Sequence, residues 1–390
     1  MFSSRTDWLL APNRLTRHLE ERRRQGLPVL DLTESNPTHC GFAAEPEILK
    51  SLQDPRSLTY EPDPRGFLRA RQAVCEYYAD RGVSVRPEQV FLTTSTSEAY
   101  TYVFRLLADP RDKVLLPQPS YPLFDFLAGI NDLDVVSYPL HYSEDWWIDL
   151  DEMRNGWVPR AKAVIVVHPN NPTGSFVKSR EFDFLSEYCR QNDGALIADE
   201  VFADYVLEAG DNRVPSHAAV SDVLTFTLSG LSKISALPQM KLGWMVVSGP
   251  EEEMKTALER IEVIADTYLS VSAPIANALP ALLEHRKTVQ PRIKEHLRSN
   301  LEWLDERMAT CPSAKRLKVE GGWYAVLKVP EALSDEDWAV ELLAKDGVLV
   351  HPGHFYDFSD EGHLVISLLT EEAAFREGTG RVLARISKCS

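Results

Sequence analysis

Seven short β-branched runs alternate with longer helical patterns between residues 46 and 272, and this alternation restricts the fold more than any other feature of the chain. Such alternation is the signature of βαβ units and of a mainly parallel sheet. The predicted strands are Val90–Thr93, Lys113–Leu116, Val135–Tyr138, Ala163–Val167, Ala195–Ala198, Val223–Leu228 and Trp244–Val247. The sequence therefore predicts an α/β fold in which residues 46–272 form a large domain around a seven-stranded, mainly parallel sheet.

Glycines mark the expected ends of two helices in this domain. The helix predicted over Phe67–Asp80 is followed by Gly82, and the helix over Ser179–Arg190 is followed by Gly194. A helix commonly closes with a residue in the left-handed conformation, which glycine adopts without steric cost. Both glycines are therefore predicted to be left-handed caps.

The pattern changes after residue 272. A long helical pattern runs to about Met308, and strands are predicted over Lys318–Lys328, Val348–His351 and His363–Leu369. Ser334 and Asp337 have the spacing of a capping box for a helix that ends before Gly347. We expect a smaller α+β domain over residues 273–390, joined by an N-terminal segment over residues 1–45.

Charge and cysteine content restrict the partners of the chain. The 390 residues carry 42 basic and 58 acidic side chains, a net charge of −16, which argues against binding to nucleic acid. No apolar run approaches the roughly 20 residues of a membrane span. The five cysteines are scattered, without C-x-x-C spacing, and no secretory signal is visible at the start. We expect a cytoplasmic protein with no zinc or other metal site.

Polar residues stand directly after four of the seven predicted strands. In open parallel sheets, ligands bind just outside the carboxyl ends of the strands, so these residues are expected to surround one site. They are the hydroxyl-rich stretch 93–98, the turn 168–174, Asp199 with Glu200, and the stretch 229–233 that ends in Lys233. The first stretch opens a predicted helix, whose free backbone N–H groups suit a phosphate.

A lysine, a carboxylate, an amide and a phosphate cradle on one rim indicate a specific cofactor. A lysine in a desolvated pocket becomes a nucleophile that forms Schiff bases. Pyridoxal 5′-phosphate needs a lysine for its aldehyde, an acid for its pyridine nitrogen and an anion site for its phosphate. A generic nucleotide-binding domain is disfavoured because no G-x-G-x-x-G or P-loop motif follows the first strand.

At these residues the chain resembles the class I/II aminotransferases, which are fold-type I pyridoxal-phosphate enzymes. The resemblance covers nearly the whole chain. Its motifs are Asn170–Gly174, then Asp199 at 28 residues after Asn171, then Lys233 at 34 residues after Asp199. It implies an enzyme that moves an amino group between an amino acid and a 2-oxo acid, and a homodimer whose subunits share their active sites.

The resemblance also implies roles for individual residues. Lys233 forms the Schiff base and moves the substrate proton, Asp199 pairs with the pyridine nitrogen, and Tyr121 stacks on the ring. The other implied cofactor contacts are Ser95, Thr96, Asn171, Ser232, Lys241 and, reaching the phosphate of the neighbouring subunit, Tyr60. The candidate substrate contacts are Ser35, Asn171, Trp323 and His354.

Three positions depart from the family pattern. Lys241 stands where an arginine usually clamps the phosphate, and Phe202 replaces a tyrosine that donates to the cofactor's phenolic oxygen. Val365 stands where an arginine usually binds the α-carboxylate of the substrate. The candidate substitutes for that arginine are His351, His354, Arg65 and Arg69.

The missing arginine keeps other functions open. The same scaffold hosts decarboxylases and lyases, and an amine without a carboxylate would not need the arginine. A non-enzymatic, cofactor-binding regulator is a further alternative. The presence of Lys233 and the short, non-basic segment before the large domain disfavour a regulator.

Overall fold

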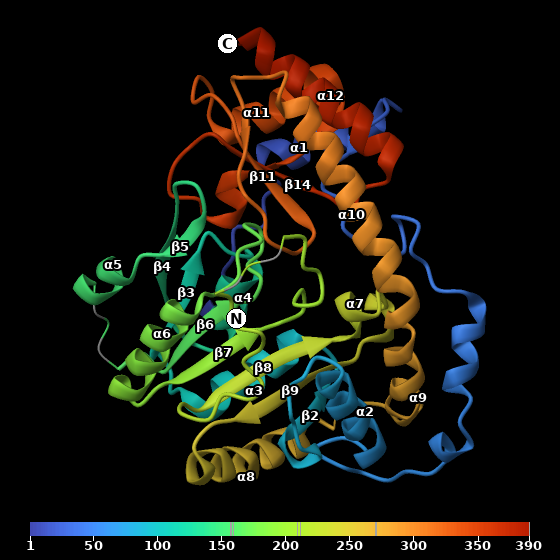
Figure 1. The fold of residues 1–390 in the computed structure, drawn as a ribbon, viewed down its shortest axis with the longest axis vertical. Coiled ribbons are helices and arrows are strands. Elements are labelled where there is room, and N and C mark those ends of the chain that lie inside the picture. The colour runs from blue at the N-terminus through green and yellow to red at the C-terminus, as the bar shows by residue number, and fades with distance from the viewer. Residues whose placement is uncertain (157, 159, 209, 211, 270, 390) are drawn as a thin grey trace.

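An eight-stranded sheet forms the centre of the larger part of the molecule (Figure 1). The structure is a computed structural model and describes residues 1–156, 158, 160–208, 210, 212–269 and 271–389. Along the sheet the strands are β2 (Val90–Thr93), β9 (Gly243–Ser248), β8 (Thr225–Gly230), β7 (Ala195–Asp199), β6 (Ala163–Val167), β3 (Lys113–Gln118), β4 (Asp134–Tyr142) and β5 (Trp146–Ile148). Strands β8, β7, β6, β3 and β4 run parallel, while β9 and β5 are antiparallel to their neighbours.

The α/β class is confirmed, and the expected number of strands changes from seven to eight within the described residues. The missed strand, β5, is three residues long and forms a hairpin with β4. Three residues are too few for an alternating pattern to be visible in a sequence. The predicted strand 223–228 lies two residues later, over Thr225–Gly230, and so reaches directly to the helix that carries Lys233.

Helices cover both faces of this sheet, which explains why every residue of its central strands β6, β7 and β8 is buried. One face packs against α3 (Thr96–Leu107), α4 (Leu123–Ile130) and α8 (Glu251–Tyr268). The other face packs against α2 (Leu68–Ala79), α6 (Ser179–Asn192) and α9 (Ala273–Glu284). Two short helices, α5 (Leu150–Asn155) and α7 (Leu231–Ile234), complete this part.

One of the two predicted glycine caps is wrong. Gly82 is left-handed, with φ of 76°. At the end of α6 the left-handed residue is Asp193, with φ of 54°, rather than Gly194. Gly194 instead permits a close approach of two backbone segments, because a Cβ there would lie 2.7 Å from the carbonyl oxygen of Ala161.

The C-terminal part contains a four-stranded sheet and three helices, and lies above the large sheet in Figure 1. Its strands are β10 (Lys315–Arg316), β11 (Tyr324–Lys328), β14 (His363–Ser367) and β13 (His351–Pro352). Its helices are α10 (Arg286–Met308), α11 (Asp335–Glu341) and α12 (Glu372–Cys389). The predicted strand 318–328 is thus confined to its last five residues. Ser334 caps α11 as predicted, since its Oγ accepts a hydrogen bond from the backbone of Asp337 at 3.1 Å.

The N-terminal segment packs against this C-terminal part. Strand β1 (Leu30–Asp31) pairs in parallel with β12 (Val348–Leu349), and α1 (Arg14–Arg24) lies beside α11 (Figure 1). The long helical pattern after residue 272 is two helices, α9 and α10, that meet at His285. Helix α9 follows residue 272 but packs against α2, which belongs to the large part. The predicted domain boundary at residue 272 therefore remains a prediction. No described helix has the length and apolar character needed to cross a membrane.

Candidate active site

A cavity of about 300 Å³ opens at the carboxyl ends of β6, β7 and β8, near the lower end of the ~300–1,000 Å³ usual for small-molecule sites. Most of the site residues predicted from the sequence line this cavity. The predicted residues that line it are Ser35, Ser95, Thr96, Tyr121, Asn171, Asp199, Ser232, Lys233 and Lys241. Tyr100, Phe202 and Tyr324 also line the cavity.

Lys233 lies on α7, directly after β8, and its ammonium group is poorly solvated. Its Nζ lies 5.0 Å from the ring centre of Trp323 and 5.5 Å from that of Phe202. Tyr205 fixes the local backbone by donating its hydroxyl hydrogen to the Lys233 carbonyl at 2.6 Å. Burial lowers the pKa of Lys233 to about 8, although the charge of Asp199 acts in the opposite direction. Lys233 is therefore suited to act as a nucleophile and a base near neutral pH.

Asp199 is the last residue of β7 and is buried. Its Oδ1 accepts a hydrogen bond from the Val201 backbone at 3.1 Å, and its Oδ2 accepts one from the Tyr100 hydroxyl at 3.4 Å. Burial raises the pKa of Asp199 to about 6. A buried carboxylate with few donors fits a cationic ligand group, such as a protonated pyridine nitrogen.

The turn after β6 presents the Asn171 amide to the cavity. Asn170 holds this turn, since its carbonyl oxygen accepts from the Gly174 backbone at 2.8 Å and its side chain accepts from the Thr173 hydroxyl at 3.0 Å. Asn171 Oδ1 is buried and has no hydrogen-bond partner among the described residues. Buried polar atoms are normally paired, so this unpaired acceptor fits a hydrogen-bond donor of a ligand or of bound water.

The amino end of α3 has the features of an anion-binding site. Ser95 caps the helix by accepting a hydrogen bond from the Glu98 backbone at 3.2 Å, and Thr96 begins it. A Cβ at Gly243 would lie 3.1 Å from the Ser95 carbonyl carbon, so glycine keeps this cradle open. The helix dipole, the free N–H groups and the Lys241 ammonium favour a phosphate here.

Three predicted residues lie outside the cavity lining. Trp323 is fully buried, and its ring centre lies 5.0 Å from Lys233 Nζ. His354 is exposed. Tyr60 is 79% exposed on the surface of the chain, and its predicted role concerns a second subunit.

The structure places Val365 in β14, where it is fully buried and packs against Trp146 and Tyr356. None of the four candidate substitutes for the arginine lines the cavity. Arg65 pairs with Glu262 at 2.6 Å, Arg69 lies 3.7 Å from Asp54, and His351 hydrogen-bonds Tyr356. Among the described residues, the cations that line the cavity are Lys233 and Lys241.

Sequence reasoning missed Tyr100 as a residue of the site. Tyr100 lies in the second turn of α3 and Tyr324 begins β11, so neither follows a strand of the large sheet. Tyr324 hydrogen-bonds the side chain of Ser35, which lowers its pKa against the larger, opposite effect of burial. This pair brings the N-terminal segment and the small sheet to the cavity.

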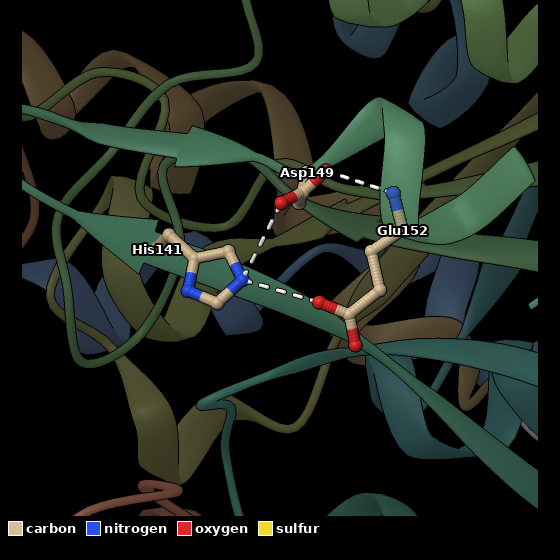
Figure 2. A group of neighbouring side chains, drawn as sticks. All are labelled: His141, Asp149 and Glu152. Atoms are coloured by element: carbon tan, nitrogen blue, oxygen red, sulfur yellow. Dashed lines mark hydrogen bonds and ion pairs between the residues drawn. The ribbon is translucent and has the colours of Figure 1, made fainter. Parts of the chain in front are cut away.

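A second group of titratable side chains lies away from the cavity, beside the β4–β5 hairpin (Figure 2). His141 Nε2 lies 3.3 Å from Glu152 Oε2 and 3.6 Å from Asp149 Oδ2. Asp149 also caps α5 through its Oδ1. Solvent-accessible ion pairs account for this cluster, and we assign no metal to it.

The fold and the cavity define an α/β protein in which a poorly solvated lysine and a buried carboxylate line one cavity. The chain belongs to the aminotransferase class I and II family, whose sequence profile matches residues 28–377. The chain is accordingly an aminotransferase, and this family is dependent on pyridoxal phosphate.

Individual relatives are named aminotransferases and, in one case, a lyase. Glutamate-pyruvate aminotransferase AlaA of Escherichia coli (strain K12) is 28% identical, over 90% of this chain and 89% of its own. An S-alkyl-thiohydroximate lyase of Arabidopsis thaliana is 29% identical, over 80% of this chain and 69% of its own. The solved alanine aminotransferase of Pyrococcus furiosus has the same fold, with a TM-score of 0.89, 24% identity and full coverage of both chains.

Proposed function

We propose that this aminotransferase uses pyridoxal 5′-phosphate, attached to Lys233, to move an amino group between an amino acid and a 2-oxo acid. The observation that carries the proposal is one cavity in which Lys233, Asp199 and the side-chain amide of Asn171 meet. Lys233 fits the aldehyde of the cofactor, Asp199 fits its pyridine nitrogen, and the amide N–H of Asn171 would donate to its phenolic oxygen. Ser95, Thr96, Ser232 and Lys241 would bind its phosphate.

The cofactor, when bound, supplies an aldehyde that captures amines and a ring that accepts electrons from a bond to the substrate Cα. Lys233 Nζ removes the Cα proton and later returns it. With a pKa of about 8, roughly a tenth of such a lysine is neutral at pH 7. Asp199 would hold the proton on the ring nitrogen, and Tyr121 would cover one face of the ring.

The amino donor and acceptor are proposed from the relatives. The Escherichia coli protein is named for glutamate and pyruvate, and several relatives are named alanine aminotransferases. Glutamate and alanine are therefore the first amino donors to test. Ser35 and Tyr324, which pair at the cavity wall, would contact the substrate.

Val365 favours a second candidate function. With no arginine or histidine among the described residues of the cavity lining, the site fits an amine that lacks an α-carboxylate. It also fits a lyase or decarboxylase, and one relative at 29% identity is named a lyase.

A single-turnover experiment tests these alternatives. Purified holoenzyme is mixed with single amino acids, and the cofactor absorbance is followed for conversion to pyridoxamine phosphate. Conversion by glutamate or alanine supports the proposal. Conversion by a simple amine alone would favour the amine-specific alternative, and release of ammonia or carbon dioxide would favour a lyase or decarboxylase.

We also propose a homodimer, a cytoplasmic location and the domain division given above. Tyr60 lies beside the strongly exposed apolar side chains of Leu58 and Leu269, a surface that a second copy would cover. The cysteines are all free thiols, which supports a reducing compartment.

A further inference from the structure

Asp199 is hydrogen-bonded by a buried phenol that the sequence motifs did not indicate. The Tyr100 hydroxyl donates to Asp199 Oδ2 at 3.4 Å, while the Val201 backbone donates to Oδ1. Tyr100 is only 2% exposed and lines the cavity. It is the side-chain donor to Asp199 among the residues that the structure describes.

The position of this phenol is fixed by packing. The ring of Tyr100 meets Phe124 edge-on, with centres 5.3 Å apart, and lies 5.8 Å from the ring of Phe104. Burial and the charge of Asp199 both raise the pKa of Tyr100, so the phenol keeps its proton and remains a donor. Its hydroxyl is therefore held at the carboxylate before any ligand binds.

The geometry points to Tyr100 as a positioning residue that keeps Asp199 ionised and aimed at the pyridine nitrogen of the cofactor. This inference rests on the proposed function, since it assumes that Asp199 faces that nitrogen. Hydrogen bonds to an ionised group are stronger than neutral ones, and losing one leaves a buried charge poorly compensated. Tyr100 thus contributes to cofactor affinity and to its pH dependence without touching the substrate.

Burial, hydrogen bonds and neighbouring charges all affect the pKa of Asp199. Burial is the largest influence and raises its pKa, the hydrogen bonds from Val201 and Tyr100 lower it, Glu200 raises it, and Lys233 lowers it. Glu200 stays ionised because hydrogen bonds with His217 and the charge of Arg81 lower its pKa to about 2 despite burial. Tyr121 faces Asp199 as well, and its own pKa is raised. Removal of the Tyr100 hydroxyl would leave the other influences in place and raise the pKa of Asp199 further.

The test compares Tyr100→Phe with Tyr138→Phe. Tyr138 is a matched control, because its buried hydroxyl also makes a hydrogen bond, at 2.7 Å, but to the Ile165 carbonyl rather than to Asp199. Holoenzymes are dialysed against graded concentrations of pyridoxal 5′-phosphate from pH 5 to pH 8, and the dissociation constant is measured at each pH. Asp199→Asn serves as the reference for complete loss of the carboxylate charge.

We expect Tyr100→Phe to weaken cofactor binding about fivefold to tenfold at pH 6. We also expect the pH at which binding weakens to move upward, while Tyr138→Phe follows the wild type. If Asp199→Asn weakens binding and Tyr100→Phe does not, the inference is wrong and the proposed function stands. If the wild type binds no cofactor, the proposed function itself fails.

Discussion

Lys233 is the residue on which the proposed chemistry depends most. The protein surroundings lower its pKa to about 8, and it lies in the cavity with Asp199. We expect Lys233→Ala to lower turnover at least about a thousandfold, because the variant loses both a nucleophile and a general base. The measurements are steady-state turnover and the absorbance of protein-bound cofactor.

Lys294→Ala is the matched control for this change. Lys294 lies on α10, is half-buried, and also has a lowered pKa, but it does not line the cavity. It should keep the turnover of the wild type. Full turnover in Lys233→Ala would contradict the assignment of the site.

Phe202 permits a test in which a hydroxyl group is added to the site rather than removed from it. By family resemblance a tyrosine at this position donates to the phenolic oxygen of the cofactor, and here the ring lies 5.5 Å from Lys233 Nζ without a hydroxyl. We expect Phe202→Tyr to stabilise the phenolate and so lower the pKa of the cofactor–lysine linkage by about one unit. A pH titration of the bound-cofactor absorbance measures this pKa, and an unchanged or raised value would contradict the placement of Phe202.

At the scale of elements, the turn after β6 is shaped by Gly174. This residue has φ of 73°, and a Cβ there would lie 2.4 Å from Val319 and 2.5 Å from the Gly321 carbonyl oxygen. We expect Gly174→Ala to lower the free energy of unfolding by about 3 kcal/mol, from backbone strain and overpacking together. Gly26→Ala is the control, because Gly26 has φ of 66° but open space around it, and should cost about 1 kcal/mol.

Urea denaturation followed by circular dichroism compares the two variants. An equal loss of stability in both would show that backbone strain accounts for the whole effect. The close approach between the β6 turn and the segment 319–321 would then be contradicted. A larger loss in Gly174→Ala would support the packing that holds Asn171 in the cavity.

Elements with a long, regular pattern could be predicted from the sequence. Strand β6 was predicted with its observed bounds, because five consecutive apolar residues buried on both faces leave a clear signal. The short strand β5 and the left-handed Asp193 could not be predicted, because hairpin pairing and the contact of Gly194 with residue 161 are tertiary effects.

The residues of the candidate site also fall into those that could be predicted from the sequence and those that could not. Residues at strand ends, such as Asp199 and Asn171, could be predicted because parallel strands bring their carboxyl ends to one edge. Tyr100 reaches the same cavity from the side of α3, and Tyr324 reaches it from the small sheet. The position of Tyr100 depends on how α3 packs against the sheet, which local sequence patterns do not report.

At the scale of the whole molecule, the cavity combines distant parts of the chain. Ser35 comes from the N-terminal segment, Lys233 from the large sheet and Tyr324 from the small sheet. Tyr60, in contrast, does not line this cavity, and its proposed site lies in a second subunit. It is exposed, as are Leu58 at 92%, Val263 at 69% and Leu269 at 63%. Such apolar exposure favours a surface that is covered in an assembly.

Mixing a Lys233→Ala variant with a Tyr60→Ala variant, each expected to have lost activity on its own, tests whether the active site is shared between subunits. In a mixed dimer of Lys233→Ala and Tyr60→Ala, one of the two sites would combine an intact Lys233 with the intact Tyr60 of the partner subunit. Random reassociation of equal amounts makes half of the dimers mixed, so we expect about a quarter of the wild-type activity. Turnover after denaturation and joint refolding, with each variant refolded alone as the control, measures this recovery. Activity no higher than the mean of the two parents would mean that Tyr60 serves its own chain or no site, because a residue acting within one subunit cannot restore a partner that lacks Lys233.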